Sequence, residues 1–158
     1  SGGDDKLVAG YMKELSDTGC YQVSEEMRKK IQSVFVGGFS SEAETEATIG
    51  KMMDEHKYLI DTHTAVAFHV LEQYRKETGD QTKTVVASTA SPFKFCDAVL
   101  DALNVTDKAT GTALLDQLAE VSGMPAPQPL ATLKDKQVRF TSWTEKEQMR
   151  AVVTDFLK

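Results

Sequence analysis

A short apolar segment, Thr84–Ser88, is the feature that most constrains the fold. The segment is β-branched and uncharged, and such a run is typical of a strand that is buried on both faces, as in a parallel sheet. The second strand-like segment is residues 137–141, where polar and apolar residues alternate. Two short strands do not form a stable open sheet by themselves. The sequence therefore predicts that neighbouring strands are supplied from outside this chain.

Most of the remaining sequence predicts helices. Apolar spacing and capping residues indicate seven helices that begin near Asp5, Ser24, Ser41, Asp61, Pro92, Thr112 and Thr144. The pairs Ser41/Glu44 and Thr144/Glu147 have the spacing of a capping box. Residues 123–129 hold three of the four prolines and predict an extended loop.

Composition restricts the class of protein. The chain has 158 residues, which suits one domain, and a net charge of −6. An acidic chain gains nothing from releasing the counterions of DNA or RNA, so nucleic acid is not expected as a partner. No run reaches the roughly 18 apolar residues of a membrane span. The acidic charge also disfavours anionic membrane surfaces, so no membrane partner is expected.

The cysteines indicate the cellular compartment of the chain, and the first residues indicate whether it is part of a longer protein. Cys20 and Cys96 lie far apart, which does not suit a disulfide framework or a zinc site, and we expect a reducing cytoplasm. The chain starts Ser1-Gly2-Gly3, without an initiator Met. This start favours the hypothesis that the chain is a cut piece of a longer protein.

Two segments could carry chemistry. In Asp61–Ala65, His63 could act as an acid or base and the neighbouring threonines could contact an anion, or Asp61 could simply cap a helix. In Ser88–Phe95, hydroxyl groups stand between a strand end and a helix start, where α/β sheets bind ligands. The alternative is an ordinary joint in which Ser91 caps the helix.

Other single residues give weaker signals. Lys94 could form a Schiff base, although a solvated lysine is the simpler interpretation. His56, His63 and His69 do not share metal-ligand spacing, and no metal site is predicted. The cysteines have no histidine near them in sequence, so a thiol nucleophile has little support.

Together the two segments resemble a known family. Residues 58–67, YLIDTHTAVA, and residues 86–95, VASTASPFKF, are similar in content, order and separation to the C-terminal part of threonine synthase. The preceding helical stretch, including Thr18-Gly19 and residues 35–39, is also similar. The resemblance covers most of the chain.

The resemblance implies a pyridoxal-phosphate enzyme of fold type II. Such an enzyme converts O-phospho-L-homoserine and water into L-threonine and phosphate, the last step of threonine biosynthesis, with the cofactor as electron sink. In that family a hydroxyl residue at a late strand end faces the pyridine nitrogen. Thr89 matches this position and Ser88 lies beside it, so these two are the implied cofactor-binding residues.

Departures from the family pattern limit which residue roles the resemblance implies for this chain. Position 62 is Thr where proline is common, and position 91 is Ser where histidine is common. The family's Schiff-base lysine lies in a phenylalanine-lysine-aspartate setting far upstream, so that role is not assigned to Lys94. The Gly-rich phosphate loop is also missing from this sequence. We therefore expect no catalysis by this chain alone and assign no catalytic residue.

The resulting expectation is an α/β fold class, namely the C-terminal segment of a fold-type II enzyme. As an isolated chain it should be mainly α with a few short strands. Residues 1–158 are predicted to form one domain, with a helical segment at 1–57 and a segment at 58–158 that completes the cofactor-binding domain. The alternative is a non-catalytic, acidic helical module that binds another protein. An isolated piece could also self-associate to cover its exposed surface.

Overall fold

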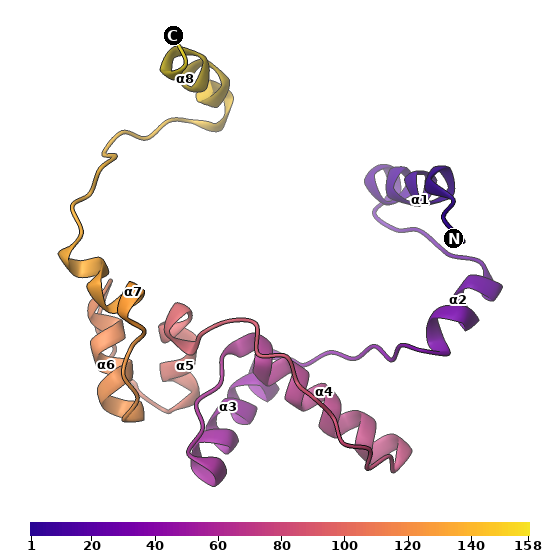
Figure 1. Cartoon of the computed structure of the whole chain (residues 1–158), viewed down its shortest axis with the longest axis horizontal. Coiled ribbons are helices and arrows are strands. Elements are labelled where there is room, and N and C mark those ends of the chain that lie inside the picture. The colour runs from indigo at the N-terminus through magenta and orange to yellow at the C-terminus, as the bar shows by residue number, and fades with distance from the viewer.

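The structure is a computed structural model that describes residues 1–158. It contains eight α-helices and three 3₁₀ segments in the order drawn in Figure 1. Their bounds are α1 Asp5–Thr18, α2 Glu25–Gln32, α3 Glu42–His56, α4 Thr62–Thr78, η1 Pro92–Lys94, α5 Cys96–Ala102, α6 Ala113–Ser122, α7 Gln128–Ala131, η2 Thr132–Asp135, η3 Lys146–Gln148 and α8 Met149–Phe156.

The helices form a central group with two arms. Helices α3 to α7 lie together, whereas α1 and α2 form one arm and α8 forms another, each joined to the centre by an extended segment (Figure 1). Within the central group, α3 packs against α4 and α5, and α5 packs against α6. The packed part of this chain is therefore much smaller than its length suggests.

One hydrophobic core lies inside the central group. Its fully buried members include Ile49 of α3, Leu100 of α5 and Leu118 of α6. The complete cluster is Ile49, Leu59, Ile60, Ala65, Phe93, Cys96, Val99, Leu100, Ala102, Leu115 and Leu118. All eleven residues come from residues 49–118, so neither arm contributes to the core.

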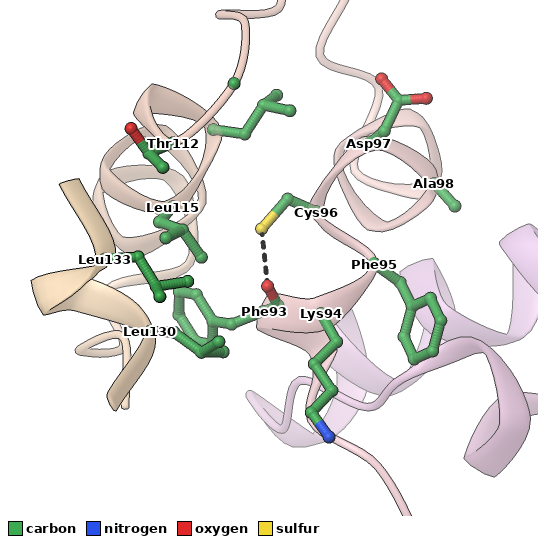
Figure 2. A pocket seen from close by; sticks show the side chains of 12 residues that line it. Phe93, Lys94, Phe95, Cys96, Asp97, Ala98, Thr112, Leu115, Leu130 and Leu133 are labelled. Carbon is green, nitrogen blue, oxygen red and sulfur yellow. Dashed lines mark hydrogen bonds between the residues drawn. The ribbon is translucent and has the colours of Figure 1, made fainter. Parts of the chain in front are cut away.

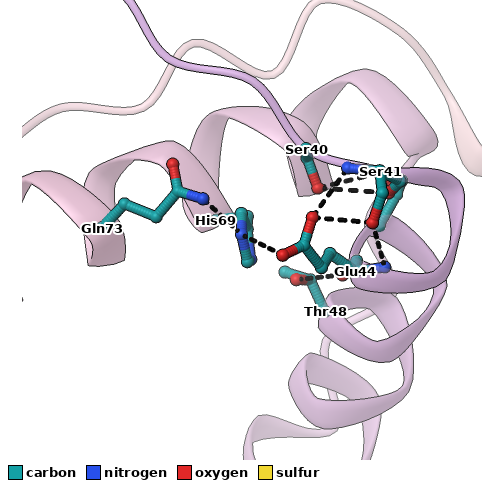
Figure 3. Close-up of polar contacts among 7 residues, drawn as sticks. Ser40, Ser41, Glu44, Thr48, His69 and Gln73 are labelled. Atoms are coloured by element: carbon teal, nitrogen blue, oxygen red, sulfur yellow. Dashed lines mark hydrogen bonds and ion pairs between the residues drawn. The ribbon is translucent and has the colours of Figure 1, made fainter.

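Helix α3 begins as predicted and is linked to α4 through its first turn. The Ser41 side chain accepts from the Glu44 N–H, and the Ser41 N–H donates to Glu44 Oε2 at 2.8 Å, which completes the capping box. The other carboxylate oxygen of Glu44 lies 3.6 Å from His69 Nε2 on α4. Gln73 lies 2.8 Å from the same ring nitrogen (Figure 3). The hydrogen bonds from the Ser41 hydroxyl and N–H hold the pKa of Glu44 below its ordinary value.

The two predicted strands are wrong, because the structure contains no strand. Residues 84–88 are extended, but the backbone of residues 83–90 forms no backbone hydrogen bond. Residues 137–141 lie in the extended connection between η2 and α8, away from that segment (Figure 1). A strand requires a hydrogen-bonded neighbour, and these two segments are too far apart to pair. The mainly α character agrees with the expectation for the isolated chain.

Several helix boundaries also differ from the prediction. Ser91-Pro92 opens a 3₁₀ turn rather than a continuous helix, and α5 begins only at Cys96. The predicted capping box at Thr144 is wrong, because the final helical stretch starts after Glu145 with no side-chain cap. The predicted loop at 123–129 ends early, since Gln128 and Pro129 start the short helix α7.

The arms expose much of their apolar surface. The exposed large side chains of α1, of α8 and of the residue that follows α8 are Leu7, Val8, Met12, Leu15, Met149, Val152, Val153, Phe156 and Leu157. Soluble proteins rarely leave such faces uncovered, so both arms present surfaces suited to packing against further protein. None of the helices has both the length and the apolar character needed to cross a membrane.

Candidate functional site

The extended segment at residues 83–90 lies along α4. Tyr58, Thr64, Phe68, Leu71 and Arg75 share a hollow of about 290 Å³ with three residues of the segment, Thr84, Val86 and Ser88. The side chain of Val86 is half-buried, whereas Val85 is 95% exposed on the opposite side. One face of the segment therefore contacts α4, and the other face is open.

A buried carboxylate caps α4 at the end of this segment. Asp61 is fully buried and accepts from the N–H of His63 at 2.9 Å and from the N–H of Thr64 at 3.3 Å. Its second oxygen accepts from the Thr64 hydroxyl. This confirms the predicted cap, and the helix N-terminus favours the negative charge.

The same threonine connects the cap to the segment. Thr64 Oγ lies 3.1 Å from Ser88 Oγ. The Thr64 hydroxyl is placed to donate to Ser88 as well as to Asp61. The relay therefore runs from Ser88 through Thr64 to Asp61.

Hydrogen bonding determines the charge of Asp61. Burial tends to raise the pKa of this carboxyl, but the hydrogen bonds from the Thr64 hydroxyl, the Thr64 N–H and the His63 N–H outweigh burial and lower the pKa. Asp61 is therefore ionised in the folded chain at neutral pH, and its charged form is more stable in the folded state than in the unfolded state.

This lowered pKa predicts a loss of stability in acid. Because the pKa of Asp61 is lower in the folded state, its contribution is complete above the unfolded value of about 3.9. It is lost as the pH falls below that value and through the lower folded pKa. We expect the free energy of unfolding, measured by urea titration between pH 7 and pH 3, to fall more steeply for the unsubstituted chain than for Asp61→Asn. Parallel pH profiles would contradict this assignment.

Thr89 occupies an open position next to the relay. Its side chain is exposed, and its hydroxyl forms no hydrogen bond within the chain, whereas the Ser88 hydroxyl contacts Thr64. Thr89 lies just before η1, at the carboxyl end of the extended segment. Its hydroxyl is therefore available to a ligand, either as donor or as acceptor.

The other predicted residues of the two segments have structural contacts. The Ser91 side chain accepts from the Phe93 N–H at 3.3 Å, so it caps the turn that follows. His63 is exposed, with Nδ1 3.4 Å from Asp61 Oδ1 and its ring 5.0 Å from that of Phe95. Lys94 is exposed, in agreement with the simpler interpretation of this residue.

The buried cysteine is poorly suited to be a nucleophile. Cys96 Sγ donates to the Phe93 carbonyl at 3.2 Å, and burial raises the pKa of the thiol. The thiol therefore stays protonated at neutral pH. No group of three or more His, Cys, Asp or Glu side chains is arranged to hold a metal ion.

Sequence reasoning missed one apolar pocket. It has a volume of about 560 Å³ and lies between η1 and α5 on one side and α6 to η2 on the other (Figure 2). Its apolar lining includes Phe93, Leu115, Leu130 and Leu133, but neither Ser88 nor Thr89. Leu130 directly follows the proline-rich stretch and Leu133 lies in the short turn η2, and neither has a periodic neighbourhood that would predict a pocket wall.

Comparison with known proteins identifies the family. The family model described as threonine synthase, C-terminal, matches residues 64–153. Threonine synthase of Corynebacterium glutamicum is 34% identical over 93 residues, which is 58% of this chain and 19% of that protein. Human threonine synthase-like 1 is 28% identical over 123 residues, which is 77% of this chain and 16% of that protein.

A solved structure shows the same fold. The pyridoxal-phosphate-bound threonine synthase from Brucella melitensis matches with a TM-score of 0.70 and 29% identity. The match covers 99% of this chain and 29% of that chain, so both arms are included in the similarity. This chain spans under a third of each of these relatives. It belongs to the threonine synthase C-terminal family.

Proposed function

We propose that this chain is the C-terminal part of a threonine synthase, which converts O-phospho-L-homoserine and water into L-threonine and phosphate. The observation that carries the proposal is the family match over residues 64–153, which includes the complete VASTASPFKF segment. When bound, pyridoxal phosphate would supply the electron sink for this chemistry. The substrate and the cofactor belong to the complete enzyme.

Thr89 fits the expected contact with the pyridine nitrogen. Its hydroxyl is exposed and free of partners within the chain, as a group reserved for a ligand should be. A neutral hydroxyl can donate to an unprotonated ring nitrogen without forcing a positive charge on the ring. Ser88 lies next to it and holds the segment to α4 through Thr64.

The other parts of a cofactor site are missing from these 158 residues. The sequence contains no phenylalanine-lysine-aspartate segment and no Gly-rich phosphate loop. Lys94 is exposed, and it lines an apolar pocket that Thr89 does not line. We therefore propose that the cofactor lysine and the phosphate loop lie in an upstream part of the protein, and that residues 58–158 complete the cofactor-binding domain.

The first test addresses activity of the chain alone. We expect no phosphate release when the purified chain is incubated with pyridoxal phosphate and O-phosphohomoserine, because the cofactor lysine is absent. A complete threonine synthase assayed in parallel controls for the substrate. Steady phosphate release that depends on this chain would overturn the proposal that it is inactive alone.

The second test concerns the gene. Sequencing the DNA upstream of codon 1 should show an open frame that encodes the missing lysine segment and phosphate loop. A stop codon followed by a start signal would instead favour the alternative, a helical module that binds another protein. The open edges of residues 83–90 are the observation that supports that alternative.

The third test concerns Thr89 in a protein that joins this chain to its upstream part. We expect Thr89→Val to weaken pyridoxal-phosphate binding by up to about tenfold, the cost of one lost hydrogen bond of about 0.5–1.5 kcal/mol. Equilibrium titration of the cofactor measures the change, and Thr62→Val is the matched control. Unchanged affinity would count against Thr89 as a cofactor contact.

A further inference from the structure

Residues 83–90 keep an extended form without any help from a sheet. Their backbone groups make no backbone hydrogen bond, so side chains of α4 must hold the segment. Arg75 donates to the Thr82 carbonyl at 3.2 Å and to Thr84 Oγ at 3.4 Å. Thr64 contacts Ser88 at 3.1 Å. The segment is thus attached to the helix near both of its ends.

The spacing of the two attachments matches an extended chain. Thr64 and Arg75 are eleven residues apart on α4, or about 16 Å at 1.5 Å per residue. Four residues of extended chain, from Thr84 to Ser88, span about 13 Å. Between the attachments Val86 faces the helix and Val85 faces outward. Helix α4 therefore supports the segment along its length, and the segment runs antiparallel to the helix.

Thr64 determines which way the Ser88 side chain points. Its side chain is buried, with 2% of the residue exposed, and its hydroxyl contacts both Asp61 and Ser88. Because successive side chains of an extended segment point to opposite faces, holding Ser88 against α4 directs Thr89 to the open face.

We propose that Thr64 is a positioning residue, which holds Ser88 through the relay to Asp61 and so presents Thr89 to the cofactor. Ser88 then acts as the anchor of the segment rather than as a second cofactor contact. The proposal rests on the proposed function only for the identity of the ligand that meets Thr89. The anchoring itself is a property of this chain and is tested on the chain alone.

The test measures order in the segment by amide ¹⁵N relaxation on the complete 158-residue chain. We expect order parameters of residues 87–89 near 0.85 in the unsubstituted chain and below about 0.6 in Thr64→Val and Ser88→Ala. The double variant should match either single variant, because both changes remove the same hydrogen bond. Thr64→Ser keeps the hydroxyl and should retain the order. Thr62→Val, in the same helical turn, is the control.

Two results would overturn the proposal. One is a flexible segment in the unsubstituted chain, and the other is a segment that remains ordered in Ser88→Ala. Since Ser88 is exposed, that variant should fold even where Thr64→Val does not, and circular dichroism checks both. In another outcome, the order parameters follow this pattern while Thr89→Val leaves cofactor binding unchanged. In that case the anchoring of Ser88 by Thr64 is supported, and the proposed contact between Thr89 and the cofactor is contradicted.

Discussion

Replacing Asp61 by alanine is expected to lower the free energy of unfolding by about 2–3 kcal/mol. The carboxylate is fully buried and accepts from two N–H groups and from the Thr64 hydroxyl. Alanine leaves all three donors without this partner at the end of a helix that packs on the core. The substitution also breaks the relay that reaches Ser88. We expect urea titration to show the loss as a lower midpoint with an unchanged slope.

Asp4→Ala provides the matched control for this result. Asp4 caps α1 by accepting from the Leu7 N–H at 2.9 Å, so it has the same local role as Asp61. It is exposed, and α1 contributes nothing to the core. The free energy of unfolding of the central group should therefore change by less than about 0.5 kcal/mol. Equal losses for the two variants would show that burial of Asp61 adds nothing to an ordinary cap.

The features predicted correctly from the sequence depend on neighbours in the chain. Ser41 and Glu44 are three residues apart, and their capping box forms as predicted. Asp61 likewise caps α4 through the two residues that follow it closely, His63 and Thr64. Such contacts are encoded locally, so residue type and spacing are sufficient to predict them.

The features that sequence reasoning missed depend on distant residues. Thr64 and Ser88 are 24 positions apart, and nothing in either segment indicates that their hydroxyls meet. The composition of residues 84–88 predicts a strand, but composition is a property of the segment alone. Pairing is a property of its neighbours, and this chain supplies none. The segment is extended as its composition indicates, but it is not part of a sheet.

The failed capping box at Thr144 has a different cause. The spacing of Thr144 and Glu147 fits the motif, but Thr144 contacts the Gln148 side chain at 3.4 Å and the helical stretch starts after Glu145. This arm does not pack against the helices of the central group (Figure 1). Without tertiary contacts to favour one start, a short helix has little to determine its first residue.

Leucine truncations in the core and in the C-terminal arm should separate the packed from the unpacked part of the chain. Leu118 of α6 is fully buried in the hydrophobic core. We expect Leu118→Ala to lower the free energy of unfolding by about 2–5 kcal/mol, since it removes apolar contacts and leaves a cavity. Leu157 lies just after α8 and is 77% exposed. Leu157→Ala should change stability by no more than about 0.5 kcal/mol.

The comparison of the two leucines has a consequence for the arms. Urea titration of both variants at several protein concentrations measures stability and association together. A loss above about 1 kcal/mol for Leu157→Ala would mean that α8 is packed in solution, and a dependence on protein concentration would locate that contact between copies of the chain. The expected small and concentration-independent change would mean that α8 remains open in the isolated chain. Its apolar face would then be free to pack against the remainder of a complete enzyme.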